Sequence, residues 1–256
     1  MIFFGVIGRN TINFLAIIGR LSIFTYKALH SCILPPYYFK NLQKQLIEVG
    51  YYSLPVVGLT TLFSGMVLAL QSHTGFSRFS AEGAVATVVA LSITRELSPV
   101  LAGLMVSGRI GASIAAEIST MRVTDQIDAL KTLSTDPYKY LVAPRIIACV
   151  LCLPILVLIG DLVGLYGGYI IGIYKLNLNA SSYLHQTIMY LQPIDIISGA
   201  IKATVFGFLI ALMGCYHGYY SGRGAQGVGK ATTNAVVSSS ILILISNYIL
   251  TELFFA

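Results

Sequence analysis

Two charged residues and a proline interrupt an apolar stretch near the middle of residues 81–108. Arg95 and Glu96 are adjacent, and Pro99 follows one helical turn later. A single Arg or Glu at the centre of a bilayer costs about 2.5–3.5 kcal/mol on insertion scales, so each needs a partner, water or a polar ligand. Neighbouring residues on a helix point about 100° apart, so these two do not simply pair with each other. Pro99 also leaves the Arg95 carbonyl without its helical donor, which predicts a bend and a polar spot in an apolar wall.

Other residues whose side chains could take part in a reaction are isolated in the sequence. Asp161 lies deep in the apolar run 145–174 and suits either a proton relay or a structural carboxyl that is partnered or neutral. The histidines show neither metal-ligand spacing nor a nucleophile–base arrangement. They are His30, His73, His185 and His217. We therefore predict no catalytic residue and no metal site.

Two motifs resemble functional sites, but a structural role explains each of them better. Cys149 and Cys152 form a CxxC, but an apolar setting disfavours the thiolate that redox chemistry needs. The segment SGRGAQGVGKATT matches GxGxxG and nearly matches a phosphate loop, yet such loops follow a β-strand. Here an apolar helix precedes the segment, and Ala231 stands where the magnesium-binding Ser or Thr belongs. We expect its glycines to form a tight turn rather than a nucleotide site.

The composition identifies the elements that must position these residues. Of 256 residues, 56% are hydrophobic and only 10% charged, against about 25% charged in a soluble domain. The apolar runs are continuous, which indicates spanning helices and excludes the alternating strands of a barrel. The net charge of +6 is dispersed between these runs, which argues against nucleic-acid binding. The expected spans are 51–71, 81–108, 145–174, 195–216 and 231–255.

Two further helices are amphipathic. In residues 1–33, Arg9, Asn13, Arg20 and Lys27 fall on one side, which favours a helix in the membrane interface over a tilted spanning helix. The polar segment between the second and third spans predicts a short helix that Thr124 would cap. Its apolar face repeats every three residues, at Ile127, Leu130 and Leu133.

Lysine and arginine placement predicts the orientation. Basic residues concentrate in the N-terminal region, in the segment 109–145 and near 217–230, whereas the other side has only Arg78, Lys175 and, a short way into the fourth span, Lys202. By the positive-inside rule, the N-terminus and the amphipathic loop helix are cytoplasmic and the C-terminus is outside.

The segment TRELSPVLAGLMVSGRIGASIAAEISTMRVTDQIDALKTLSTDP resembles the signature of the MlaE/YrbE permease family, the membrane subunit of MCE-type lipid ABC transporters. The similarity extends through GMVLALQ upstream and GVGKATTNAVV downstream, and covers roughly residues 45–255. Two departures conserve charge: Asp125 stands for the commoner Glu, and Lys230 for an Arg.

The resemblance implies an all-α membrane protein with an N-terminal interfacial amphipathic helix, five transmembrane helices and a cytoplasmic coupling helix. One permease domain would cover 1–256, with 1–47 as interfacial helix and connector, 51–255 as the bundle and about 109–145 as the coupling loop. It implies a homodimer in the bacterial inner membrane, with an ABC ATPase that binds ATP and Mg²⁺, a periplasmic MCE-domain protein and a phospholipid substrate. This chain itself would hold no cofactor and would not be an enzyme.

The resemblance also assigns residues. A lipid cavity would be lined by Arg95, Glu96, Leu97, Leu68 and Leu70. ATPase coupling would involve Glu117, Arg122, Asp125, Ile127, Asp128 and Leu130. Two alternatives stay open: the same machine carrying a sterol or fatty acid, and a secondary transporter that uses Glu96 and Asp161.

Overall fold

The computed structural model describes the backbone of residues 2–77 and 83–255, and the side chains of residue 12 and of residues 15–77 and 83–255. Within these residues the chain is helical throughout, apart from turns and short connections. Five helices are long and apolar enough to cross a membrane, which confirms the expected all-α membrane fold. They are Phe39–Phe76, Ala84–Val123, Tyr138–Tyr174, Pro193–Tyr219 and Gly224–Phe255.

Three of the spans are built from consecutive helical pieces. The first contains α2 (Phe39–Val49), the 3-10 turn η1 (Tyr51–Ser53) and α3 (Leu54–Phe76). The second contains α4 (Ala84–Ser92), η3 (Ile93–Leu97), α5 (Ser98–Val106), η4 (Ser107–Gly111) and α6 (Ala112–Val123). The third joins η5 (Tyr138–Val142) to α8 (Ala143–Tyr174). The elements η3, η4 and η5 are π-helical turns.

The remaining helices complete the chain. The fourth and fifth spans are α10 (Pro193–Tyr219) and α11 (Gly224–Phe255). Helix α7 (Gln126–Thr132) follows α6, and α9 (Ala180–Tyr190) connects α8 to α10. Helix α1 (Ile2–Ile33) precedes the first span.

The second span is longer than the expected 81–108, because Arg109 does not end it. Its guanidinium donates to the Glu48 carbonyl at 3.1 Å, to the Glu48 carboxylate at 3.2 Å and to the Ser53 hydroxyl at 2.8 Å. These contacts with Glu48 and Ser53 give the Arg109 guanidinium its hydrogen-bond partners within the bundle. The helix can therefore include Arg109, and it continues to Val123. The segment expected to be a loop from 109 therefore begins as helix.

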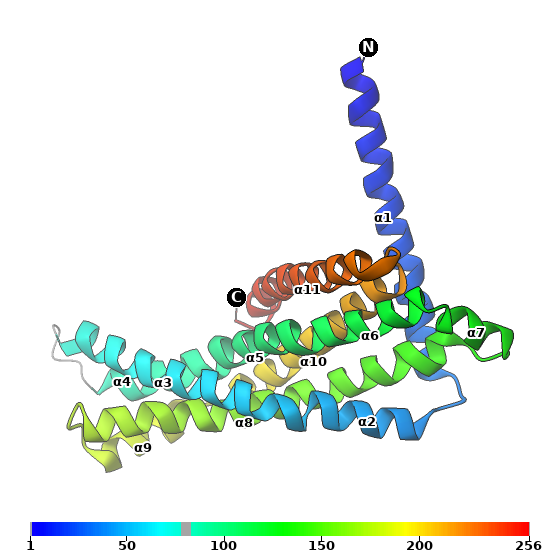
Figure 1. Ribbon diagram of the computed structural model, residues 1–256. Helices are drawn as coiled ribbons and strands as arrows, with labels where there is room; N and C mark the ends of the chain where they lie inside the picture. The colour runs from blue at the N-terminus through cyan, green and yellow to red at the C-terminus, as the bar shows by residue number, and fades with distance from the viewer. Residues whose placement is uncertain (1, 78–82, 256) are drawn as a thin grey trace.

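The spans run roughly side by side, with α7 at one end of the bundle and α4 and α9 at the other (Figure 1). Helix α10 supplies much of the core through fully buried residues such as Phe206 and Ile210. Helices α3 and α8 approach closely where Gly65 faces the backbone of Gly164. Small residues permit such backbone contact between helices in lipid.

Helix α1 leaves the bundle at the α7 end and crosses the direction of the spans (Figure 1). Phe24 and Ala28 are fully buried, and Phe24 packs against the rings of Tyr138 and Tyr216. Residues 15–20 are exposed. This geometry is compatible with a helix along the membrane surface, and the interfacial position stays a prediction. The side chains of Arg9 and Asn13, and all of Arg78, lie outside the described residues.

The glycine-rich segment forms the expected tight turn. Gly224 has φ +75°, a conformation that favours glycine, and begins α11. Gly227 has no room for a Cβ, because the backbone of Gly222 lies against it. The motif thus connects α10 to α11 instead of following a strand.

The contact between α3 and α8 predicts a matched pair of substitutions. Gly65→Ala places a methyl group against the Gly164 carbonyl, whereas a Cβ at Gly58, on the same helix, meets nothing within 4 Å. We expect Gly65→Ala to destabilise the folded permease by about 1–3 kcal/mol through overpacking, with Gly58→Ala close to wild type. Unfolding of both variants in detergent measures this. Equal stability would show that the two helices separate without cost.

Candidate functional site

Arg95 and Glu96 lie in the π-helical turn η3, directly before Pro99 in α5. A π-helical turn re-aims side chains relative to a regular helix and is frequent at functional sites. The Arg95 carbonyl, which the sequence predicts to lose its helical donor, accepts a hydrogen bond from Lys202 Nζ at 2.8 Å. The polar spot predicted at Pro99 therefore exists, and a lysine from α10 fills it.

The Glu96 carboxylate joins three elements of the bundle. It accepts hydrogen bonds from Lys202 Nζ at 2.8 Å, from the Thr251 hydroxyl at 2.8 Å and from the Asn247 amide at 2.9 Å. Lys202 is on α10, and Asn247 and Thr251 lie one turn apart on α11. The Lys202 side chain is completely buried. A buried ammonium needs a paired charge and hydrogen-bond acceptors, which Glu96, Thr251 and the Arg95 carbonyl provide.

Arg95 forms a second ion pair with α10. Its Nε donates to Asp195 Oδ1 at 2.7 Å, and the Asp195 side chain is completely buried. The other Asp195 oxygen accepts from the Gln192 backbone N–H at 2.9 Å, which closes a capping box at the start of α10. The Arg95 guanidinium also lies 4.2 Å from the ring centroid of Phe255.

These groups form one connected unit, which we call the Arg95–Glu96 cluster. It contains Arg95, Glu96, Asp195, Lys202, Asn247 and Thr251. Two positive and two negative charges cancel within it. Lys202 and Asp195 are buried, whereas the side chains of Arg95 and Glu96 are 32% and 37% exposed. The cluster therefore presents one cation and one anion at the surface of an apolar span.

The other residues predicted to line a lipid cavity are leucines outside the cluster. Leu97 is half-buried beside Glu96. Leu68 packs on α3 against the buried Val85, Val89 and Ile93, and Leu70 is half-buried on the same helix. A cavity shared by these leucines and the cluster stays a prediction.

Asp161 stands apart from the cluster. It is 5% exposed, and neither carboxylate oxygen has a hydrogen-bond partner among the described residues. Across the described chain, no hydrogen bond or ion pair links Asp161 to Glu96.

The predicted coupling element contains a compact set of ion pairs. Asp128 accepts from Arg122 at 3.0 Å and from Lys131 at 2.9 Å. The hydrogen bond from Lys131 and the nearby charge of Arg122 lower the pKa of Asp128. Glu117 pairs with Arg145 at 2.6 Å.

The start of α7 differs from the sequence prediction. Thr124 does not cap the helix, because its hydroxyl donates back to the Thr120 carbonyl at 2.9 Å. Asp125 precedes α7 in a left-handed conformation, with φ 56°, and makes no side-chain cap. The break between α6 and α7 is thus made by the backbone at Asp125.

The apolar face of α7 is divided between the inside and the outside of the bundle. Ile127 is fully buried, and Leu130 is half-buried against the main core. Leu133, immediately after the helix, is 74% exposed. Docking through Ile127 and Leu130 stays a prediction, and the most accessible apolar group of this segment is Leu133.

Comparison with known proteins agrees with this architecture. The family described as Permease MlaE matches residues 42–253. The chain belongs to the MlaE permease family. It is 64% identical over 250 residues to a probable ABC transporter permease protein of Rickettsia prowazekii, covering 98% of this chain and 96% of the relative. It is a multi-pass membrane permease.

More distant relatives match over most of their length. A probable ABC transporter permease protein of Synechocystis is 43% identical over 216 residues, covering 84% of this chain and 82% of the relative. The intermembrane phospholipid transport system permease protein MlaE of Haemophilus influenzae is 32% identical over 256 residues, covering 99% and 97%.

The sequence missed the partners of Arg95 and Glu96, namely Asp195, Lys202, Asn247 and Thr251. A polar signal was visible, since Lys202 interrupts an apolar run and Asn247 and Thr251 are four residues apart. The partners are 100 to 155 residues away from Arg95 and Glu96, so spacing could not pair them. The positive-inside rule places Lys202 with the basic residues of the outer side, whereas the structure buries it inside the bundle as the ion-pair partner of Glu96.

The cluster predicts a charge-rescue experiment. Lys202→Met removes a buried cation while an unbranched side chain fills its volume, leaving the Glu96 carboxylate without its charge partner. We expect the free energy of unfolding to fall by about 1.5–3 kcal/mol, the worth of a hydrogen bond to a charged group, because Glu96 stays partly exposed and keeps Asn247 and Thr251. The double variant Lys202→Met with Glu96→Gln should recover most of this loss. Unfolding of the permease in detergent measures both, and failure of the double variant to recover would mean that Lys202 acts independently of Glu96.

Proposed function

We propose that this chain is the membrane subunit of an ABC transporter that moves glycerophospholipids between the inner and outer membranes of a bacterium. In this proposal the permease is a homodimer in the inner membrane, and a periplasmic MCE-domain protein exchanges lipid with it. Membership of the MlaE permease family supports the general class, and the name of the Haemophilus influenzae relative supports phospholipid as the cargo.

One observation carries the proposal: the Arg95–Glu96 cluster exposes a cation and an anion, from adjacent residues, within a membrane-spanning segment. A glycerophospholipid headgroup brings a phosphate, often with an ammonium, into the same environment. Arg95 matches the phosphate through charge-assisted hydrogen bonds, and Glu96 matches the ammonium. The buried partners Asp195 and Lys202 hold both groups in position.

The same geometry supports this reading over its alternatives. A sterol has no charge for the cluster to recognise, and a fatty acid has only an anion. A secondary transporter would need a chain of polar groups that carries a proton or ion across the bundle, but the hydrogen bonds of Glu96 lead to Lys202, Thr251 and Asn247 and, among the described residues, stay within the cluster. Asp161 makes no described contact with Glu96 that would relay a proton between them.

The proposal assigns energy supply to a partner ATPase that binds ATP and Mg²⁺. The glycine-rich segment of this chain connects two spanning helices, a context unlike that of a phosphate loop. Helix α7 lies at the end of the bundle where the basic residues concentrate, which supports a cytoplasmic position for it (Figure 1). The N-terminus is then cytoplasmic and the C-terminus periplasmic.

The proposal predicts that the charges of the cluster are needed for transfer beyond their role in folding. The double variant Lys202→Met with Glu96→Gln removes one charge of each sign from the cluster and leaves Arg95 and Asp195 paired with each other. We expect it to assemble with the ATPase but to transfer phospholipid at least about tenfold more slowly, because a lost charged hydrogen bond is worth about 1.5–3 kcal/mol. Transfer between proteoliposomes measures this. Wild-type transfer by the assembled double variant would mean that Glu96 and Lys202 act only in folding.

ATPase coupling is tested at the exposed end of α7. Leu133→Asp places a charge in a predicted protein contact without disturbing the core, whereas Leu133→Met keeps the site apolar. We expect Leu133→Asp to reduce ATPase co-purification about tenfold or more, because an unpaired charge is costly to bury in an interface. Leu133→Met should co-purify normally. Intact co-purification of Leu133→Asp would remove this segment from the ATPase interface.

A further inference from the structure

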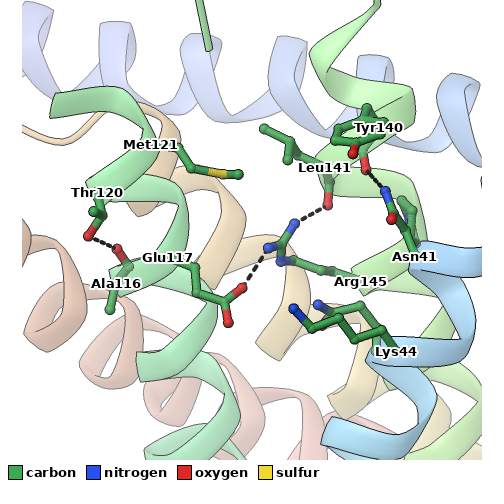
Figure 2. Close-up of a pocket in the computed structure, with 11 residues that line it drawn as sticks. Asn41, Lys44, Ala116, Glu117, Thr120, Met121, Tyr140, Leu141 and Arg145 are labelled. Atoms are coloured by element: carbon green, nitrogen blue, oxygen red, sulfur yellow. Dashed lines mark hydrogen bonds and ion pairs between the residues drawn. The ribbon is translucent and has the colours of Figure 1, made fainter. Parts of the chain in front are cut away.

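A second polar site lies at the α7 end of the bundle, away from the Arg95–Glu96 cluster. A pocket of about 590 Å³ opens between α2, α6 and the junction of η5 with α8. Figure 2 shows Lys44 on the α2 side, Glu117 on the α6 side and Arg145 between them. Its volume lies within the range of small-molecule sites.

The floor of this pocket is a fixed, buried arginine. Arg145 is 7% exposed, and it donates to the Leu141 carbonyl at 2.7 Å and to Glu117 Oε2 at 2.6 Å. These two contacts leave its Nε–H without a partner among the described residues. The guanidinium therefore cannot rotate freely, and it keeps a positive charge at the base of the pocket.

Gln45 lines the pocket beside Lys44. The residue is 8% exposed, and its side-chain amide has no hydrogen bond to any described residue. The amide is not among the enclosed polar groups of the described chain, so it is open to the pocket. It can therefore donate to an acceptor that enters the pocket.

The charged residues that line the pocket indicate which ligand group it would bind. Lys44 and Arg145 are positive and Glu117 is negative, so the pocket carries one net positive charge. Arg145 is paired with Glu117, whereas Lys44 has no ion pair within the described residues. A free ammonium beside a free amide donor suits a phosphate oxygen. The second oxygen of Glu117 is available for an ammonium group.

The surface next to the pocket is apolar and faces outward. Pro144 lines the pocket at the start of α8, and positions seven and eleven residues later return to the same face of that helix. Those positions are Leu151 and Ile155, which are 52% and 57% exposed. A ligand with a phosphate head and hydrocarbon chains could thus place its head in the pocket and its chains along α8. Neither free phosphate nor a protein segment uses both features.

We propose that this pocket binds the phosphate headgroup of a phospholipid from the membrane leaflet on the α7 side. Lys44 and Gln45 bind the phosphate, and the acyl chains lie along Leu151 and Ile155. The bound lipid fills the space between α2 and α6, so it braces the helix that leads directly into α7. It is a resident lipid, distinct from the cargo of the Arg95–Glu96 cluster.

Lipid retention by the purified full-length complex tests this proposal. The complex is stripped of loosely held lipid, supplied with vesicles of phosphatidylethanolamine and phosphatidylglycerol, washed, and counted for bound lipid by native mass spectrometry. Lys44→Ala removes the free cation, and Thr120→Phe narrows the pocket at an exposed lining position. Lys40→Ala is the matched control, because Lys40 is exposed on the same helix and does not line the pocket.

Wild type and Lys40→Ala should each retain about one phospholipid per permease chain more than Lys44→Ala and Thr120→Phe, which should bind the pocket lipid about tenfold less tightly. Equal retention by all variants would overturn the proposal, because the lipid would then be held elsewhere. Binding of inorganic phosphate that depends on Lys44, with unchanged lipid retention, would make the pocket a free-anion site. Loss of the ATPase with lipid retained would make it a protein-docking site. Phospholipid held at the Arg95–Glu96 cluster is counted equally in wild type and in every variant, so the difference between them reports the pocket and is independent of the proposed cargo.

Discussion

The ion pair between Glu96 and Lys202 is the constraint on which the bundle depends. Lys202 is completely buried in α10, and a buried ammonium is tolerated only with a paired charge and satisfied hydrogen bonds. Glu96, Thr251 and the Arg95 carbonyl supply these, and each comes from η3 or α11. The cation therefore fixes the relative positions of the second, fourth and fifth spans.

The π-helical turn at η3 makes this pairing possible. Pro99 removes one backbone donor, and the wider turn directs both Arg95 and Glu96 to partners outside their own span. Arg95 then fixes the start of α10 through Asp195, and Glu96 fixes α11. A local defect in one helix is thus compensated by contacts with two others, and the two side chains remain partly exposed for a polar ligand.

The two ends of the bundle are held by different means. Near the cluster, charges and hydrogen bonds connect the spans, whereas α3 and α8 meet through glycine backbones. Toward the α7 end, Arg109 of η4 is paired with Glu48 of α2, and Arg145 of α8 is paired with Glu117 of α6. Arg145 Nε is enclosed without a partner among the described residues, and Lys44 and the Gln45 amide are open to the same pocket, which is why we assign a lipid to it.

Composition and continuous apolar runs determined that the chain is an all-helical membrane protein with five spans, because a bilayer demands long apolar helices whatever their arrangement. The pattern of RELSPV also showed that Arg95 and Glu96 need partners. Only the tertiary structure decided which ones, because Asp195, Lys202 and Thr251 are far away in sequence and many pairings satisfy the same charges. It likewise decided that Arg109 lies within a helix and that Ile127 faces inward. Helical periodicity reports which residues share a face, but the neighbouring helix that covers this face is set by packing.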